Sequence, residues 1–283
     1  MKTVQSRALV INDLSSFGKC SLTAAIAVLS AMNIQPCPLP TAVLSSQSEF
    51  PDFYCRDLTE IMPGYKKSWQ KNGERFDGIC TGYFANSRQL DSAIDIIDTF
   101  GSRSGTVLVD PVMGDGGRLY PVYDAAACEK MKRLASRADI LTPNLTELCI
   151  LSGADYSALS REPDCLERTA QAAKPLADGR GVIVTGIRCR GDICNMVISG
   201  GQVDIIRSKR VDESFSGTGD IFSAVVFGSV LSGKTLTESA KTAAKFVELA
   251  IADTLKQPYN PIYGVNFEKY LATLSEVTTN ANT

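Results

Sequence analysis

Short apolar runs alternate with longer amphipathic segments along most of the chain. The clearest runs of strand length lie at residues 8–11, 77–81, 106–110, 138–141 and 182–185. Between the second and third of these runs, apolar side chains recur three or four residues apart from Leu90 to Ile97, which is the period of an amphipathic helix. This alternation is typical of a mostly parallel sheet with helices on both faces, so we predict an α/β fold.

Other segments refine this expectation. Residues 193–199 and 202–206 are joined by Gly200 and Gly201, which predicts a hairpin and therefore an antiparallel edge on the sheet. Further predicted elements are a strand at 38–44 and helices at 22–32, from about 144, and at 165–174, 217–230 and 236–255.

No repeat or low-complexity linker divides the chain, so we expect one domain over residues 1–283. Residues 47–73 are the most irregular part, and we expect a loop-plus-helix excursion there, placed to act as a lid beside a site. The polar residues 275–283 are expected to form a flexible tail.

The charge balance argues for a small-molecule partner. The 29 Lys and Arg residues against 31 Asp and Glu residues give a net charge of −2, without the basic surplus of a nucleic-acid binder. No run of 18 apolar residues occurs, so no membrane span is expected. The nine cysteines include no Cys-x-x-Cys pair and are interpreted as small core residues in a reducing, cytoplasmic setting.

The chain contains no histidine. This excludes Ser-His-Asp and Cys-His nucleophile pairs, His-ligated zinc and haem, and a histidine base. Any proton transfer must therefore use a carboxylate, Lys, Tyr or Cys.

The sharpest local motif is the segment 216–220, Ser-Gly-Thr-Gly-Asp, which continues directly into an apolar helix. Glycines at a helix start allow close approach of a ligand, and the free N–H groups with the helix dipole favour an anion such as phosphate. Asp220 would stand beside that anion and could accept a proton from an attacking hydroxyl. A plain glycine-rich loop closed by a first-turn Asp is the alternative interpretation.

Three more polar segments follow predicted strands, where ligands bind in open α/β sheets. Residues 110–117 carry Asp110 and Asp115 on a glycine-rich segment that suits magnesium and phosphates or, alternatively, a simple turn. Residues 142–147 place Asn144 and Glu147 at a helix start, where they could bind a hydrated cation or cap the helix.

The fourth polar segment, residues 12–21, follows the first strand and precedes a helix. It does not fit the P-loop pattern, and no dinucleotide-binding Gly-x-Gly-x-x-Gly occurs, so these two classes lose their main support.

Together these motifs resemble the ribokinase-like superfamily over about residues 8–255, and within it the vitamin kinases, with pyridoxal kinases the most similar. The matching segments are Thr81-Gly-Tyr83, Asp110-Pro-Val-Met-Gly-Asp115, Leu141-Thr-Pro-Asn144 with Glu147, and residues 210–220, in the same order. The resemblance implies a ribokinase-like fold, a homodimer, and ATP-dependent phosphorylation of the 5′-hydroxymethyl group of pyridoxal, pyridoxine or pyridoxamine, with Mg²⁺ and often a monovalent cation.

The resemblance also implies roles for particular residues. Asp220 would be the catalytic base, Gly217, Thr218 and Gly219 the anion hole, and Asp115 and Glu147 the residues that serve the metal. Asp110, Asn144, Thr185, Ser208, Lys209, Arg210 and Val211 would lie along ATP. Asp13, Ser48, Tyr83 and Asp220 would contact the heteroaromatic alcohol.

Two positions depart from the pyridoxal kinase pattern. Asp13 stands where those kinases usually have a Ser, and it looks more like hydroxymethylpyrimidine kinases of thiamine synthesis; Gln47 stands where a His is common. Such a kinase is therefore the main alternative. A non-catalytic ligand-binding relative, a sugar kinase of the same superfamily and a metal or redox protein using the cysteines are further alternatives.

Overall fold

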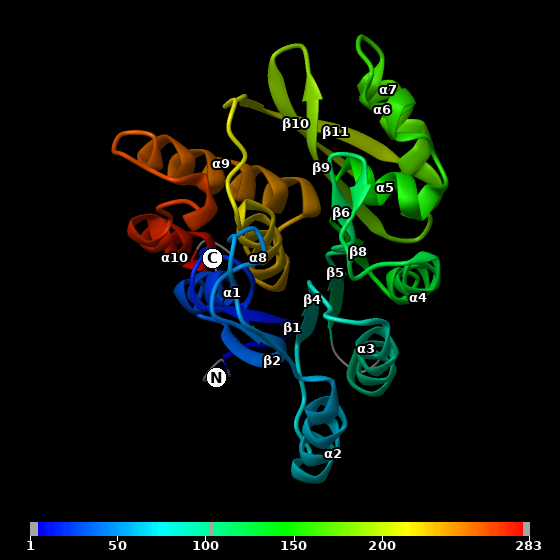
Figure 1. Cartoon of the computed structure of the whole chain (residues 1–283), viewed down its shortest axis with the longest axis vertical. Helices are drawn as coiled ribbons and strands as arrows, with labels where there is room; N and C mark the ends of the chain where they lie inside the picture. The colour runs from blue at the N-terminus through cyan, green and yellow to red at the C-terminus, as the bar shows by residue number, and fades with distance from the viewer. Residues whose placement is uncertain (1–4, 102–104, 280–283) are drawn as a thin grey trace.

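One continuous sheet runs through the molecule. In the computed structural model, which describes residues 5–101 and 105–279, it has nine strands in the order β11-β10-β9-β8-β5-β4-β1-β2-β3 (Figure 1). The strands are β1 (Arg7–Ser15), β2 (Gln35–Leu44), β3 (Cys55–Asp57), β4 (Gly78–Thr81), β5 (Thr106–Val109), β8 (Ile140–Leu141), β9 (Gly181–Cys189), β10 (Asp192–Ser199) and β11 (Gln202–Lys209). A separate hairpin joins β6 (Gly114–Asp115) to β7 (Arg118–Leu119).

Strand direction places many carboxyl ends at one edge. Strands β1, β2, β4, β5, β8 and β9 pair in parallel, while β3 and β10 run antiparallel to their neighbours. Because β11 is antiparallel to β10, it ends at the same edge as the parallel set. The polar segments singled out after the strands are thereby brought to one side of the molecule.

Helices cover both faces of the sheet (Figure 1). They are α1 (Ser21–Ala31), α2 (Met62–Asn72), α3 (Ser87–Phe100), α4 (Ala125–Ala135), α5 (Leu145–Ser152), α6 (Tyr156–Ser160), α7 (Cys165–Ala173), α8 (Thr218–Leu231), α9 (Leu236–Thr254) and α10 (Leu271–Thr279), with 3-10 turns η1 (Thr59–Ile61), η3 (Lys174–Ala177), η4 (Pro261–Tyr263) and η5 (Glu268–Tyr270). In β1, Leu9 and Ile11 join the core under α3, α4, α5 and α7, whereas Ala8 and Val10 join the core under α1, α8, α9 and α10. Because successive side chains of a strand point to opposite faces of the sheet, β1 contributes side chains to the hydrophobic core on each face.

Most of the expected elements are confirmed. The parallel sheet, its covering helices and the β10–β11 hairpin are present, and Gly200 and Gly201 turn the hairpin with φ of 56° and 82°. Residues 47–73 form a loop, β3, η1 and α2. Helix α10 occupies 271–279, where a polar tail was expected from 275, and residues 280–283 of that expectation lie outside the described residues.

Strand β2 carries an unusual run of prolines. Pro36, Pro38 and Pro40 alternate with residues whose N–H groups face β1, so the three prolines direct their nitrogen atoms toward the outer side. Strand β3 pairs only with residues 42–44, and residues 35–40 therefore form an edge of the sheet. Proline is tolerated there because no ladder hydrogen bond is lost.

The cysteines largely follow the expectation of core packing. All nine are free thiols; seven are buried, Cys37 is half-buried, and Cys55 is exposed, so for Cys55 the prediction is wrong. Across the described ranges, no helix is long and apolar enough to cross a membrane.

Candidate functional site

The start of α8 is built around two glycines with different surroundings. Gly217 is the N-cap with φ of 76°, and a Cβ there would lie 2.3 Å from the carbonyl oxygen of Lys19. A Cβ on Gly219 would meet nothing within 4 Å. Gly217 is therefore required by the fold itself, whereas the space beside Gly219 is open to a ligand at the positive end of a 14-residue helix.

Asn12, in the carboxyl-terminal half of β1, links the first turn of α8 to the segment that follows β4. Its Nδ2 donates a hydrogen bond to Oδ1 of Asp220 at 3.0 Å, and its Oδ1 accepts one from the backbone N–H of Tyr83 at 2.8 Å. A Cβ at Gly82 would lie 2.4 Å from Asn12 Nδ2, so the small residue in Thr81-Gly-Tyr83 leaves room for this side chain. One amide thus fixes both Asp220 and Tyr83.

Asp13 is buried next to this pair, at 5% exposure. Its Oδ2 accepts a hydrogen bond from Ser15 Oγ at 2.7 Å. Burial raises the pKa of its carboxyl group above the usual value, although hydrogen bonds with Ser21 and Ser15 oppose the rise. Tyr83 is half-buried, and burial together with the nearby acidic groups raises its pKa to about 12, so its phenol stays neutral.

A second link joins α8 to the end of β5. Ser223 Oγ donates to Asp110 Oδ2 at 2.8 Å and lies 3.1 Å from the hydroxyl of Thr142, which follows β8. Ser223 is one helical turn after Asp220, so the same face of α8 contacts the ends of β1 and β5.

The start of α5 forms a complete capping box. Asn144 Oδ1 accepts from the backbone N–H of Glu147 at 3.0 Å, and Glu147 Oε2 accepts from that of Asn144 at 2.8 Å. The other oxygen of Glu147 accepts from the backbone N–H of Met113 at 3.1 Å, and Asn144 Nδ2 donates to Gly114 O at 2.8 Å. The capping interpretation is therefore confirmed, and both side chains also hold the segment that leads to Asp115.

The remaining nucleotide candidates line the same edge. Half-buried Thr185 is bridged to Asn144, while Ser208 and exposed Lys209 end β11. Arg210 is exposed and pairs with Asp212 at 3.4 Å, and Val211 packs against the core beneath α8 and α9.

The site concentrates buried acidic side chains whose pKa values are raised. Burial raises the pKa of Asp220 to about 6, with a further contribution from Asp13. Burial and the charge of Asp220 raise the pKa of Asp110 to about 7. The pKa of Glu147 lies well above its usual value because it is buried near Asp110.

This donor set fits a divalent cation. Mg²⁺ prefers carboxylate oxygens and water, and it is commonly held by one or two carboxylates together with substrate phosphates. In the part of the chain that the structure describes, no three acidic or cysteine side chains are grouped closely enough to hold a metal alone. A cation here would therefore need ligands from outside the protein, such as water or phosphate oxygens.

The loop after β2 carries Gln47 and the substrate candidate Ser48. Ser48 is exposed, and no polar contact within the described ranges joins it to Asp13 or Tyr83. Gln47 is buried; its Nε2 donates to Ile262 O at 3.2 Å, and its Oε1 accepts from the backbone N–H of Glu49 at 2.8 Å. Gln47 therefore ties this loop to the segment before α10.

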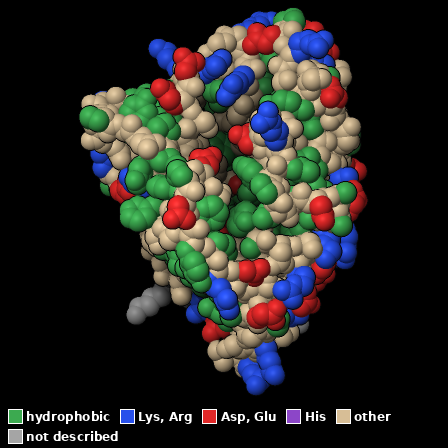
Figure 2. Space-filling model, in the orientation of Figure 1, with side chains coloured by type: hydrophobic (Ala, Val, Ile, Leu, Met, Phe, Trp, Pro, Cys, Tyr) green, Lys and Arg blue, Asp and Glu red, His purple; other side chains and the backbone are tan. Residues whose placement is uncertain are grey.

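The molecular surface is hollowed on the face that is seen in the orientation of Figure 1. Figure 2 shows the hollow between the segment that leads into α8 and the β6–β7 hairpin, with acidic and hydrophobic side chains in its walls.

Sequence reasoning missed the roles of Asn12 and Ser223. For Ser223, the available signal was a polar side chain one turn after Asp220 in a mostly apolar helix.

The fold, with the start of α8 at the carboxyl edge of the sheet, defines a ribokinase-like kinase. The chain belongs to the phosphomethylpyrimidine kinase family, whose sequence model matches residues 72–262.

Relatives extend this match over nearly the whole chain. A pyridoxine/pyridoxal/pyridoxamine kinase of Bordetella avium is 28% identical over 249 residues, covering 84% of this chain and 82% of that protein. A Bacteroides thetaiotaomicron protein assigned as a phosphomethylpyrimidine kinase, solved in a crystal form with pyridoxal, is 33% identical with a TM-score of 0.90 over 96% of each chain. The pyridoxal kinase of Lactobacillus plantarum is 27% identical with a TM-score of 0.88, over 98% of this chain and 99% of that one.

Proposed function

We propose that this protein transfers the γ-phosphoryl group of ATP to the 5′-hydroxymethyl group of pyridoxal, pyridoxine or pyridoxamine. The observation that carries the proposal is the position of Asp220, held by Asn12 at the start of α8 beside the open space at Gly219. The pyridoxal kinases of Bordetella avium and Lactobacillus plantarum are among the relatives, and the Bacteroides relative was crystallised with pyridoxal.

Asp220 accepts the proton of the hydroxymethyl group. At the same time the oxygen of that hydroxymethyl group forms a bond to the γ-phosphorus, and the bond from the γ-phosphorus to ADP breaks. Phosphoryl transfer needs alignment and charge neutralisation more than a strong base, so a carboxylate with a pKa near 6 is sufficient. The N–H groups of residues 217–219 hold the transferring phosphate. Tyr83 faces the flat ring, and Asp13 and Ser48 bind its polar substituents.

The nucleotide lies along the other half of the edge. We assign Asp110, Asn144, Thr185 and residues 208–211 to ATP. Asp115 and Glu147 are assigned to the site of Mg²⁺, which neutralises phosphate charge when bound. We also expect a monovalent cation to bind. Since both oxygens of Glu147 already accept backbone hydrogen bonds, its contribution is the placement of residues 113–115.

A coupled assay of ADP release tests the function. The acceptors are pyridoxal, pyridoxine, pyridoxamine and hydroxymethylpyrimidine, each with and without Mg²⁺. We expect turnover with the three vitamers that requires Mg²⁺. A clear preference for hydroxymethylpyrimidine would show instead that the protein is the thiamine-pathway kinase. Tight binding of the acceptors without turnover would favour a non-catalytic relative.

We also propose a cytoplasmic homodimer in which each chain is one kinase domain and residues 47–73 act as a lid. Nine free thiols suit a reducing compartment.

Exposed Leu14 and Val43 lie side by side on β1 and β2, near exposed Tyr54, and give an apolar surface for a second copy. Light scattering that gives a monomer mass, or hydrogen exchange in 47–73 unchanged by ligands, would contradict these points.

A further inference from the structure

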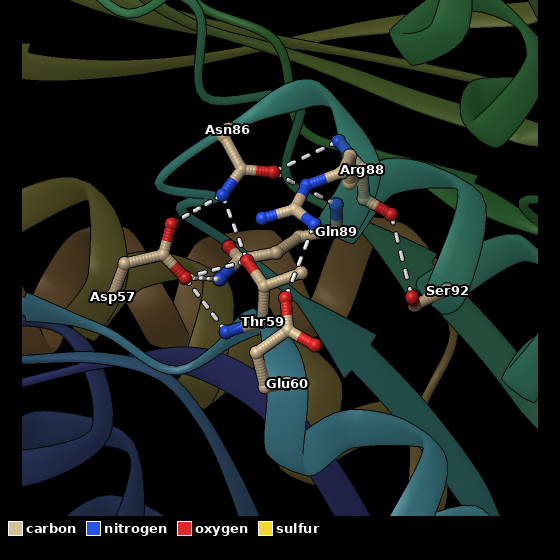
Figure 3. Close-up of polar contacts among 7 residues, drawn as sticks. All are labelled: Asp57, Thr59, Glu60, Asn86, Arg88, Gln89 and Ser92. Atoms are coloured by element: carbon tan, nitrogen blue, oxygen red, sulfur yellow. Dashed lines mark hydrogen bonds and ion pairs between the residues drawn. The ribbon is translucent and has the colours of Figure 1, made fainter.

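A polar network surrounds the buried side chain of Gln89 in the first turn of α3 (Figure 3). Gln89 is 0% exposed. Its Nε2 donates to the carbonyl oxygen of Thr41 at 2.7 Å and to Asp57 Oδ1 at 3.1 Å, and its Oε1 accepts from the backbone N–H of Ala85 at 2.8 Å. One side chain thus joins β2, the end of β3 and the loop before α3.

The sequence at this helix start has the spacing of a capping box, but only half of the box forms. Asn86 Oδ1 accepts from the backbone N–H of Gln89 at 3.3 Å, as an N-cap does. The side-chain carbonyl oxygen of Gln89 does not accept from the backbone N–H of Asn86. It accepts a hydrogen bond from the backbone N–H of Ala85 instead. In α5, by contrast, Glu147 completes its box. The side chain of Gln89 therefore connects elements rather than closing its own helix.

The network reaches Tyr83 through Thr41. The hydroxyl of Thr41 donates to the carbonyl oxygen of Tyr83 at 2.9 Å, while the N–H of Tyr83 donates to Asn12. Both backbone polar groups of Tyr83 are consequently held, one from β1 and one from β2. Gln89 fixes Thr41 on one side of Tyr83 and Ala85 two residues beyond it.

The other end of the network holds the segment after β3. Asp57 accepts hydrogen bonds from the backbone N–H of Thr59 at 2.6 Å and from the side-chain amide of Asn86. Burial opposes ionisation of Asp57, but these hydrogen bonds and the nearby Arg88 leave its pKa below the usual value. An ionised Asp57 is therefore a strong acceptor for Gln89.

We propose that Gln89 is a positioning residue that sets Tyr83 against the heteroaromatic ring and thereby controls affinity for the phosphoryl acceptor. The inference rests on the proposed function, since it assigns Tyr83 to the ring. Loss of the glutamine amide leaves the buried carbonyl of Thr41 and N–H of Ala85 without partners, so the Tyr83 loop must shift to satisfy them.

The test compares Gln89→Met, which removes both polar atoms with little change in volume, with Thr41→Val, which removes only the hydroxyl that donates to Tyr83. For each variant we expect KM for the preferred vitamer to rise about tenfold, with KM for ATP and saturating kcat near wild type. The double variant should be little worse than Gln89→Met, because both changes release the same loop. Asp98→Asn, on the exposed side of the same helix and affecting only the ion pair with Arg137, is the matched control and should change neither KM.

An unchanged acceptor KM in folded Gln89→Met would overturn the proposal, as would an equal loss in kcat and both KM values or strict additivity with Thr41→Val. If Gln89→Met does not fold, Thr41→Val alone decides by the same KM comparison. Turnover of no acceptor by the wild type would contradict the proposed function instead. The positioning role would then be decided by fluorescence titration with pyridoxal, where unchanged affinity in Thr41→Val contradicts it.

Discussion

The side-chain amide of Asn12 donates to the carboxylate of Asp220 across 208 residues of sequence, at 3.0 Å. The same amide accepts from the N–H of Tyr83. The carboxyl-terminal half of the first strand thus aligns the candidate base with the candidate ring-binding residue. A single amide that orients two partners makes the relative placement of base and acceptor a property of the sheet edge rather than of a mobile loop.

Replacement of Asp220 tests its role as base. Asp220→Asn keeps the size of the side chain and removes the proton acceptor, so we expect kcat to fall by about 10²- to 10⁴-fold. Affinity for ATP, measured by titration calorimetry, should stay close to wild type. Asp98→Asn, which affects only an exposed ion pair with Arg137, is the control. Near-normal turnover in Asp220→Asn would remove the assignment.

The pH profile follows from the raised pKa of Asp220. Because the base acts when ionised and its pKa is about 6, kcat/KM should fall as the pH drops through about 6 and level off above it. Removing the nearby negative charge in Asp13→Ser should move this acid limb to lower pH. A limb that stays in place in this variant would show that the ionisation belongs to another group.

The two glycines at the start of α8 should respond differently to alanine. Gly217→Ala meets a positive φ and the Lys19 carbonyl, and should lower the free energy of unfolding by about 2 kcal/mol or more. Gly219→Ala should leave stability intact, or raise it by about 0.5–1 kcal/mol, because alanine favours a helix. It should nonetheless reduce kcat/KM, since its methyl group enters the space assigned to phosphate. Full activity of Gly219→Ala would place the phosphate elsewhere.

Asp110 should limit stability at neutral and higher pH. Its folded pKa of about 7 exceeds the unfolded value, so the native state binds more protons and the folded protein loses stability as the pH rises from about 4 to 7. Asp110→Asn removes this cost and should stabilise the protein by the order of 1–3 kcal/mol at pH 8, with little effect at pH 4. Chemical denaturation at both pH values gives the comparison; equal effects would mean that charge is not the cause.

Asp13 should influence which acceptor is preferred. Its buried carboxylate suits a partner with a hydrogen-bond donor or positive charge, as pyridoxamine and aminopyrimidines have. We expect Asp13→Ser to lower kcat/KM for pyridoxamine relative to pyridoxal by about tenfold, the size of one charge-assisted hydrogen bond. The ratio of the two values measures the effect independently of enzyme stability. An unchanged ratio would mean that Asp13 does not face the variable ring substituent.

The sequence predicted the sheet well because apolar runs and helical periods are local signals. It also located the polar segments at Asp110, Asn144 and Asp220, since all three follow strands or open helices. The links Asn12–Asp220 and Ser223–Asp110 join residues more than 100 positions apart and have no local pattern. Gln89 was missed for the same reason, and Gln47 contacts neighbouring loops that the sequence does not place beside it.

The three prolines of β2 constrain how copies of this chain can associate. The edge strand of a sheet usually presents a row of unpaired N–H and C=O groups, with which a strand of another chain can pair. Such pairing leads to continuous sheets or to aggregation. Along residues 35–40 the outward donors are absent, because Pro36, Pro38 and Pro40 occupy those positions. A partner along residues 35–40 therefore meets no outward N–H donor, so association there depends on side-chain shape and apolar surface more than on strand pairing.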